Sequence, residues 1–307
     1  MQAAYREFLV SKAAAAPCRG FENIPALSSH LFDFQQASVA HLLRVGSGGL
    51  FLDTGLGKTL CQLEWSEHAR AASNGRALIL TPLAVARQIE REGKRFGYPA
   101  RVIRDASEVQ EGISICNYDR LHLLDPDAFG AVSLDESSIL KSFTGKTTRT
   151  LIDAFAGHRW RLSASATPAP NDHMELGQHA EFCGVMASNE MLSRFFINDT
   201  ATASQQWRLK GHAVEPFWNW MASWSRMAQM PSDLGGSDDG FILPPLKVHR
   251  HRAHESAPSM TGGLFGDEIV SATTLHELKR RTADERARVA VELVTADSDP
   301  WVIWVDS

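Results

Sequence analysis

Short apolar runs alternate with segments whose apolar residues recur every three or four positions, from residue 49 to about residue 184. Continuous apolar runs between such segments are typical of parallel strands that helices cover on both faces. We predict strands at 49–52, 77–81, 100–103, 113–116, 131–134 and 160–163, and helices at 59–72, 83–96, 147–155 and 173–182. The pattern therefore predicts an α/β fold with a parallel sheet.

The rhythm changes after about residue 184, where tryptophans become frequent. Four of the eight tryptophans lie between residues 185 and 245, which indicates a separately packed region. A helix is expected over 215–230, and its buried face would hold Phe217, Trp220, Met221, Trp224 and Met227. Further expected segments are a short amphipathic helix at 1–17, extended chain at 243–246 and 249–254, a loop at 259–266 and a charged helix at 273–294.

Bulk composition excludes several classes of protein. The chain has 307 residues, enough for two domains, and its formal net charge is −5. This charge argues against a globally basic nucleic-acid binder but is compatible with a local basic groove. Its four cysteines form no CxxC pair, so we expect neither a disulfide framework nor a zinc site. This cysteine content is typical of a protein in a reducing cytoplasm. No apolar run is long enough for a membrane span, and no membrane partner is expected.

The segment 51–59 has the features of a phosphate-binding loop. Gly55, Leu56 and Gly57 follow a predicted strand, and the glycines let the backbone turn tightly around a phosphate. Lys58 would place its charge at the β- and γ-phosphates, and the Thr59 hydroxyl would bind Mg²⁺. Leu52 occupies the place where the general signature has its first glycine.

Three further groups of polar residues complete a candidate ATP site. Asp135 and Glu136 end a predicted strand; Asp135 would bind Mg²⁺ with Thr59, and Glu136 would polarise the attacking water. Ser165 and Thr167 end the next strand and would couple the carboxylates to a neighbouring domain. Gln35 would read the adenine edge through its amide. The alternatives are an exposed acidic turn, a Ser/Thr/Pro turn and a solvent-facing glutamine on a helix.

In their order along the chain, these blocks resemble the first motor domain of superfamily 2 helicases, closest to Swi/Snf-type translocases and phage-encoded helicases. The matching blocks are 31–35 (glutamine motif), 53–59 (motif I), 78–83 (motif Ia), 113–121 (the block before motif II), 132–138 (motif II) and 162–171 (motif III). The resemblance covers residues 28–185, and 195–246 more weakly resembles the phage-type linker. It implies a P-loop, RecA-like parallel sheet with helices on both faces.

The resemblance also implies a domain organisation. We expect an N-terminal helical segment at 1–27, the ATP-binding motor domain at 28–185, a helical linker at 186–298, and the first strand of a second motor domain at 299–307. The rest of that domain, with the arginines that complete the ATP site, is expected to lie outside this chain. The chain alone is therefore expected to bind ATP weakly and to hydrolyse it poorly. Motif II also departs from the family pattern, because Ser137 and Ser138 replace its usual Ala-His or Ala-Asp ending.

Nucleic-acid contacts follow from the same resemblance. Thr81, Pro82, Asn117 and Tyr118 occupy the positions that touch the phosphate backbone in this family. A small basic cluster, Lys141, Lys146 and Arg149, either lines the same track or is a solvated helix start. The tryptophans at 207–224 could stack on bases, but their helical spacing favours packing. The histidines His249, His251 and His254 have no completing ligand set, which favours an exposed segment over a metal site.

The sequence thus predicts an ATP-dependent DNA translocase or helicase that uses ATP and Mg²⁺. Its expected partners are DNA, double-stranded and bound without sequence preference, and a second motor domain in the same or another chain. Its expected location is the cytoplasm of a bacterium or of a phage-infected host. The main alternative is a non-hydrolysing, ATP-dependent nucleic-acid-binding module or switch. A subunit of a nuclease complex is a third hypothesis, with any nuclease activity in another chain.

Overall fold

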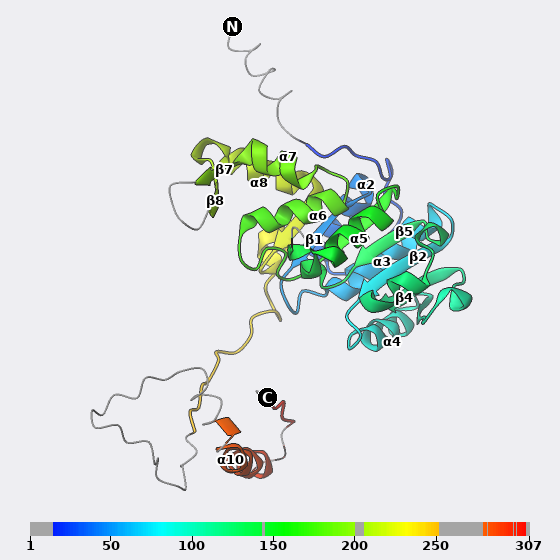
Figure 1. The fold of residues 1–307 in the computed structure, drawn as a ribbon. Coiled ribbons are helices and arrows are strands. Elements are labelled where there is room, and N and C mark those ends of the chain that lie inside the picture. Colours follow the sequence, from blue (N-terminus) through cyan, green and yellow to red (C-terminus); the bar gives the residue numbers. More distant parts are fainter. Residues whose placement is uncertain are drawn as a thin grey trace. The chain divides into compact units, whose positions relative to one another are not determined.

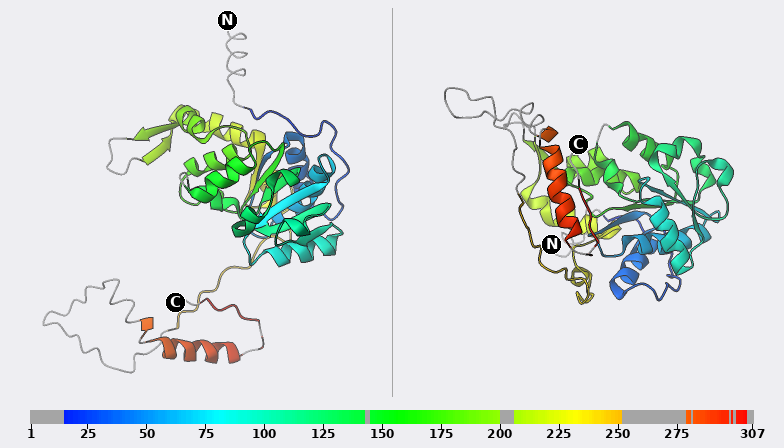
Figure 2. Two further views of the ribbon diagram at one scale, coloured as in Figure 1. Left: turned by 45° about the vertical axis from the view of Figure 1, so that its right-hand side comes forward. Right: turned by 90° about the horizontal axis from the view of Figure 1, so that it is seen from below.

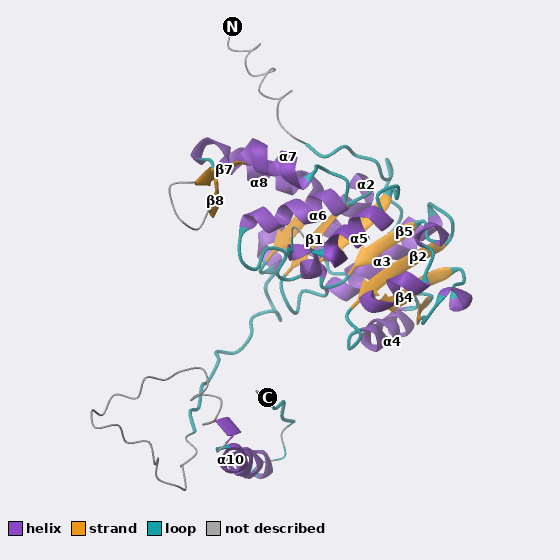
Figure 3. Cartoon of the chain, viewed as in Figure 1, coloured by secondary structure: helices purple, strands orange, loops and turns teal. Residues whose placement is uncertain are grey.

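A computed structural model describes residues 15–142, 145–199, 206–251, 279–280, 282–296, 298 and 300–304. The chain forms two compact units, Met1–Ile242 and Leu243–Ser307, which we describe separately. The first unit is a mixed α/β structure in which helices flank a central sheet (Figures 1 and 3). Most of the helix predicted at 1–17 lies outside the described residues.

The sheet of the first unit has seven strands in the order β3-β4-β2-β5-β6-β1-β9, and every adjacent pair is parallel. The strands are β1 Gly48–Leu52, β2 Arg76–Thr81, β3 Ala100–Val102, β4 Gly112–Asn117, β5 Ala131–Leu134, β6 Trp160–Ala164 and β9 Ser225–Ala228. The six strands predicted from apolar runs are confirmed to within one residue at either end. Since all strands are parallel, their carboxyl ends lie along one edge of the sheet.

Helices cover both faces of this sheet, as two further views also show (Figure 2). One apolar core includes Leu78 and Leu80 of β2, and the other includes Ala77 and Ile79 of the same strand, as the period of two in a strand requires. The helices α2 Asp33–Val45, α3 Lys58–Ala71 and α4 Ala86–Phe96 pack in the second core. The helices α5 Lys146–Ala154, α6 Leu176–Phe182, α7 Ser188–Phe195 and α8 Val214–Trp224 pack in the first.

Shorter elements connect these layers. Short 3₁₀ helices are η1 Ala106–Glu108, η2 Tyr118–Leu123, η3 Pro126–Ala128, η4 Ser137–Lys141, η5 His173–Glu175, η6 Gly211–Ala213 and η7 Pro231–Leu234. The strands β7 Phe196–Asp199 and β8 Gln206–Leu209 pair antiparallel in a separate two-stranded sheet. The helix predicted at 173–182 begins with η5 and continues as α6.

Two predictions for the tryptophan-rich region are wrong. The helix expected over 215–230 ends at Trp224, and the next four residues form β9, which pairs with β1. Met227 is therefore a strand residue with 36% of its surface exposed, whereas Trp220 and Trp224 are buried as expected. The region is also not separately packed, because these tryptophans share one core with Phe51 of β1. Residues 225–228 satisfy their backbone hydrogen bonds by pairing with the open edge of β1. This pairing determines their structure, although the spacing of Met227 from Trp224 also fits a helix.

The second unit contains the helix α10 Ala283–Thr295, which overlaps the charged helix predicted at 273–294. The strand predicted at 299–307 is not found in its described part, since residues 300–304 form neither helix nor strand, and 299 and 305–307 lie outside the description. The side chains of Val302 and Trp304 are 76% and 92% exposed. The loop predicted at 259–266 also lies outside the described residues. Within the part of the chain that is described, no helix is long and apolar enough to cross a membrane.

Candidate functional site

The predicted phosphate-binding loop joins the carboxyl end of β1 to the start of α3. The backbone of Gly55 has φ = +89° and that of Gly57 has φ = +75°, both in the left-handed region that favours glycine. Gly57 is the residue before the first turn of α3, so the loop delivers the chain directly to a helix N-terminus. The amide groups of a first helical turn lack partners within the helix, and such an end is suited to an anion.

Lys58 begins α3 and folds its side chain over this loop. Its Nζ donates to the carbonyl oxygens of Leu52 at 2.9 Å and Asp53 at 3.2 Å. Burial lowers the pKa of the Lys58 ammonium, and the negative charges of Glu136 and Asp135 partly restore it. Residues from two distant blocks of the sequence, the loop and motif II, therefore share one electrostatic environment.

Asp135 is held in place by two residues that the sequence assigned to nucleic acid. Its carboxylate accepts a hydrogen bond from Thr81 Oγ1 at 2.8 Å, and its backbone carbonyl accepts one from Tyr118 Oη at 2.6 Å. Burial raises the pKa of the Asp135 carboxyl, and the Thr81 hydroxyl acts against this shift.

The nucleic-acid contacts expected of Thr81, Pro82, Asn117 and Tyr118 remain a prediction, and the burial of these residues limits which of their groups could make such contacts. Thr81 is fully buried and Asn117 is 8% exposed, so the Thr81 hydroxyl is not open to a phosphate in this structure. The Tyr118 hydroxyl is occupied by Asp135. Pro82 and Tyr118 are both half-buried. Thr81 therefore positions the Asp135 carboxylate, because β2 and β5 are neighbours in the sheet, and Tyr118 holds the Asp135 backbone.

Glu136 has the conformation that stands out most in this site. Of all described residues other than glycine, it alone has a positive φ, with φ = 48° and ψ = 50°. A left-handed conformation costs about 1–2 kcal/mol for a residue with a Cβ atom. Its side chain is exposed, so packing does not explain the conformation. Strain of this kind concentrates at functional sites, which makes Glu136 a candidate catalytic residue on structural grounds.

Gln35 is buried against the phosphate-binding loop, and so the alternative of a solvent-facing glutamine is wrong. Its Nε2 donates to the carbonyl of Leu56 at 2.9 Å, and its Oε1 accepts from the amide of Phe32 at 2.9 Å. The amide that was expected to read adenine thus fastens the loop to the start of α2. An added Cβ at Gly57 would lie 2.3 Å from Gln35 Nε2, whereas one at Gly55 would meet nothing within 4 Å.

These two glycines allow a matched test of the Gln35 contact. Gly55→Ala is expected to lower the free energy of unfolding by about 1 kcal/mol, the cost of a left-handed alanine. Gly57→Ala is expected to cost about 2 kcal/mol more, because it displaces Gln35 from two hydrogen bonds. Chemical denaturation measures both values. The excess cost should largely vanish when Gly57→Ala is made in a Gln35→Ala background; an unchanged excess would show that Gln35 is not the obstacle.

Ser165 and Thr167 form a turn after β6. The Ser165 amide donates to Leu50 O at 3.2 Å, and Ser165 Oγ accepts from the Thr167 amide at 3.0 Å. This is the Ser/Thr/Pro turn that the sequence left as an alternative. Within the described residues, neither side chain is hydrogen-bonded to Asp135 or Glu136, so the coupling expected of them remains a prediction.

A different residue, His179 of α6, lies between the residues that follow β5 and the turn that follows β6. Its Nε2 lies 2.8 Å from the carbonyl oxygen of Pro168, and its Nδ1 lies 2.6 Å from Ser163 Oγ and 3.5 Å from Ser137 Oγ. Since a carbonyl can only accept, Nε2 carries the proton and Nδ1 accepts from Ser163. Ser138, where the family pattern has its linking residue, bonds only weakly to Glu136 O at 3.5 Å. His179 was not among the residues predicted from the sequence, although its helical spacing from Leu176 and Cys183 places it on the buried face.

The burial of His179 predicts a specific loss of stability in acid. Burial lowers its pKa from 6.5 to about 4, so between these values the unfolded chain binds a proton that the folded chain excludes. Stability from this group is complete above about pH 6.5 and is lost as pH falls to about 4, by roughly 3 kcal/mol at most. His179→Gln should flatten this part of the pH profile of unfolding.

Two controls sharpen the test. The pKa of His41 is lowered in the same direction, also to about 4, mainly by burial, so His179→Gln should reduce the acid slope without removing it. His212 is exposed, and His212→Gln should leave the slope unchanged. An acid slope that His179→Gln does not alter would contradict a buried neutral histidine.

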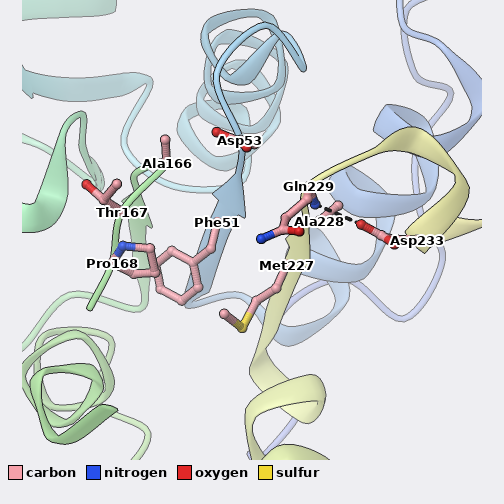
Figure 4. Close-up of a pocket in the computed structure, with 9 residues that line it drawn as sticks. All are labelled: Phe51, Asp53, Ala166, Thr167, Pro168, Met227, Ala228, Gln229 and Asp233. Carbon is pink, nitrogen blue, oxygen red and sulfur yellow. Dashed lines mark hydrogen bonds between the residues drawn. The ribbon is translucent and has the colours of Figure 1, made fainter. Parts of the chain in front are cut away.

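A pocket of about 460 Å³ lies beside the phosphate-binding loop (Figure 4). Figure 4 shows its walls: the end of β1, the turn that follows β6 and the end of β9. Gln229 and Asp233 close one side, where the Asp233 carboxylate accepts a hydrogen bond from the backbone N–H of Gln229 at 2.8 Å. The other lining residues are Phe51, Asp53, Ala166, Thr167, Pro168, Met227 and Ala228. The β9 wall could not be anticipated, because its residues were assigned to a helix.

The remaining candidate residues have ordinary structural roles. Arg149 is paired with Glu181 at 2.8 Å, which favours a solvated helix start over a nucleic-acid track. His249 and His251 are exposed, and His254 lies outside the described residues. In the described ranges, no group of three His, Cys, Asp or Glu side chains could hold a metal ion.

Comparison with known proteins identifies the fold. The structure is similar to the SWI2/SNF2 ATPase core of Sulfolobus solfataricus in complex with dsDNA, with a TM-score of 0.55 and 19% identity over 68% of this chain and 47% of that chain. The Sulfolobus solfataricus SWI2/SNF2 ATPase core domain gives a TM-score of 0.53 and 18% identity over 70% and 48% of the two chains. The chain thus spans about half the length of these structures. No family model and no curated protein matches the sequence. The protein has the RecA-like α/β fold found in helicase and SWI2/SNF2 ATPase cores.

Proposed function

We propose that this chain is the ATP-binding half of an ATP-driven motor that moves on DNA. The observation that carries the proposal is the convergence of Lys58, Asp135 and Glu136 at the carboxyl ends of the sheet strands. The charges of both carboxylates act on the Lys58 ammonium, and the lysine follows a glycine loop at a helix N-terminus. Cation, anion-binding loop and paired carboxylates are the parts that phosphoryl transfer to water requires.

Each residue has a defined task in this proposal. The glycine loop and Lys58 bind the β- and γ-phosphates of ATP, and Glu136 orients the attacking water. Asp135 and Thr59 offer the oxygen ligands that Mg²⁺ prefers, and Mg²⁺ is commonly held by one or two such ligands together with substrate phosphates. When bound, Mg²⁺ neutralises charge on the transferred phosphoryl group. Thr81 holds the Asp135 carboxylate at 2.8 Å in the orientation for this task.

Coupling of hydrolysis to movement is assigned to His179. The carboxylate pair is followed at once by Ser137, whose Oγ lies 3.5 Å from Nδ1 of His179, and His179 is hydrogen-bonded to Ser163 and to the carbonyl of Pro168. A rearrangement at Glu136 on ATP hydrolysis would therefore reach the turn after β6 through one buried imidazole. His179 acts as a positioning residue, and Ser165 and Thr167 lie in the turn that it holds.

The proposed binding partners of this chain are inferred from its fold and from its length relative to the similar structures. The Sulfolobus solfataricus core was solved with dsDNA, and we extend that substrate class to this chain as double-stranded DNA bound without sequence preference. Because the chain spans about half of such cores, the proposed motor includes a second motor domain in the same or another chain. The proposed location is the cytoplasm of a bacterium or of a phage-infected host.

One observation favours a second candidate, a non-hydrolysing ATP-dependent switch on nucleic acid. Ser138 replaces the residue that normally links motif II to motif III, and its described contact is a 3.5 Å bond to Glu136 O. A motor with a weakened link could bind ATP without turning it over. Against this candidate, Ser137 also lies 3.5 Å from His179, which is hydrogen-bonded to the turn after β6.

Phosphate release from ATP, measured with and without double-stranded DNA, tests the proposal. The motor predicts turnover that DNA stimulates and that Lys58→Ala removes, although the rate of this chain alone is expected to be low. ATP binding without turnover, even when a second motor domain is supplied, would favour the switch. Turnover that Lys58→Ala leaves intact would exclude the proposed site altogether.

A further inference from the structure

The start of α2 lies on the side of the phosphate-binding loop that is away from the carboxylates. In the sheet, β6 separates β1, which leads into the loop, from β5, which ends next to Asp135 and Glu136. Helix α2 contacts β1 and β9, and β9 lies on the opposite side of β1 from β6. A triphosphate whose γ end faces the carboxylates therefore extends its nucleoside end toward α2.

The Gln35 amide at this end is not open to a nucleobase. Both of its polar atoms are bonded to backbone groups, Nε2 to Leu56 O and Oε1 to the Phe32 amide, each at 2.9 Å. An amide could form a second bond at each atom, but only 3% of the Gln35 surface is exposed. The backbone of Gly57 also packs so closely that an added Cβ would lie 2.3 Å from Nε2. A base edge therefore finds no open donor or acceptor on Gln35.

The neighbouring Phe32 offers a different kind of contact. It precedes the first turn of α2, and with 58% of its surface exposed it is the most exposed of the described Phe, Tyr and Trp residues in the first unit. Its ring stacks on that of Phe34, with 6.2 Å between centroids and 13° between planes, and Phe241 meets both rings edge-on. Because Phe34 is buried in the core, one face of the Phe32 ring is fixed in place and the other is open.

An open aromatic face at the nucleoside end matches the feature that all nucleobases share. Every base has a π-face that can stack on an aromatic ring, whereas the differences between bases lie at their edges. We propose that this site stacks the base of its nucleotide on Phe32 and does not select adenine, so that its substrate class is the nucleoside triphosphates. The proposal rests on the motor function above and widens its substrate beyond ATP.

Base selectivity is the first test, measured with the full chain as displacement of a fluorescent ATP analogue by ATP, GTP, CTP and UTP. A side chain that reads a base edge through two hydrogen bonds discriminates by roughly 5- to 150-fold. We expect the affinities for ATP and GTP to lie within about fivefold of each other, below that range. A larger preference for ATP would overturn the proposal, because an adenine edge would then be read.

Variants of Phe32 test the stacking contact itself. Phe32→Ala is expected to weaken the binding of all four nucleotides by at least about fivefold, since an aromatic stacking partner contributes this much to the affinity for a base. Phe32→Tyr keeps the ring and should bind them as the parent chain does. Unchanged nucleotide affinity in Phe32→Ala would overturn the proposal.

Inorganic tripolyphosphate separates the base contact from a structural effect on the loop, because it has no base. Isothermal titration calorimetry should give the same tripolyphosphate affinity for the parent chain and Phe32→Ala. If Phe32→Ala weakened tripolyphosphate and nucleotides equally, the ring would only support the loop, and the proposal would fail.

Two further variants test where the base lies. Trp218→Ala removes another exposed aromatic ring, 36% exposed on α8, and should leave nucleotide affinity unchanged. Met227→Ala alters the pocket of about 460 Å³ beside the loop and should also leave it unchanged. A loss of affinity in Met227→Ala with none in Phe32→Ala would place the base in that pocket and overturn the proposal.

These outcomes distinguish the failure of this proposal from failure of the motor function. Hydrolysis that DNA stimulates, with a strong preference for ATP over GTP, would overturn only the lack of base selection. A folded chain that binds neither nucleotides nor tripolyphosphate would have no phosphate site, and the motor function would fail as well.

Discussion

Replacing Lys58 with alanine is expected to weaken ATP binding by roughly 10- to 100-fold, the largest effect on affinity of any single change in this site. A hydrogen bond to a charged group contributes about 1.5–3 kcal/mol when its partner is present. The Lys58 ammonium already lies at the loop, 2.9 Å from Leu52 O, so it needs only a change of rotamer to reach a phosphate. Titration with a fluorescent ATP analogue measures the loss.

Two comparisons separate this effect from a general loss of positive charge. Lys94→Ala removes an exposed lysine from α4 and should leave the affinity unchanged. Lys58→Arg keeps the charge, but a planar guanidinium cannot replace a compact ammonium inside a tight glycine loop, so it should bind little better than the alanine variant. Equal affinity in the parent chain and Lys58→Ala would show that the loop does not bind phosphate.

The sheet was the most predictable part of the fold, because six of its seven strands were found from the sequence. The seventh strand, β9, shows why the sequence pattern can fail to reveal a strand. Six strands are continuous apolar runs because both of their faces are covered, as in β2 with all of Ala77–Thr81 buried. In β9 the residues Arg226 and Met227 are only partly buried, so no such run exists. Its place in the sheet comes from backbone pairing with β1, which leaves no mark in the side-chain pattern.

The positions of the charged residues in the candidate site could be predicted from the sequence, but the hydrogen-bond partners of its polar residues could not. The sheet brings Lys58 near Asp135 because both follow strand ends, and strand ends can be read from the sequence. The partners of Thr81 and Gln35 depend on which strands and loops become neighbours. The side chains of threonine and glutamine can form hydrogen bonds of the same kind with phosphate, with adenine or with protein groups. Their pairing with Asp135 and Leu56 therefore required the structure.

Glu136→Gln is expected to lower the rate of ATP hydrolysis by about 10²–10⁴-fold, the usual contribution of a positioned general base. ATP binding should be unchanged, since Lys58 and the glycine loop are intact. Phosphate release with double-stranded DNA present measures the rate, and the fluorescent analogue measures binding. Glu190→Gln, at an exposed position of α7, is the matched control and should keep full activity. A Glu136→Gln variant with the parent rate would remove Glu136 from the mechanism.

The strained backbone of Glu136 adds a readout that a structural residue would not give. Asparagine adopts the left-handed conformation more readily than glutamate, and Glu136 has φ = 48°. Glu136→Asn should therefore raise the free energy of unfolding by up to about 1 kcal/mol while hydrolysis falls as in Glu136→Gln. A residue kept for stability would show the opposite, with loss of activity following loss of folded protein. Higher stability with lost turnover means that the glutamate carboxylate is retained at this position for catalysis, against the preference of the backbone.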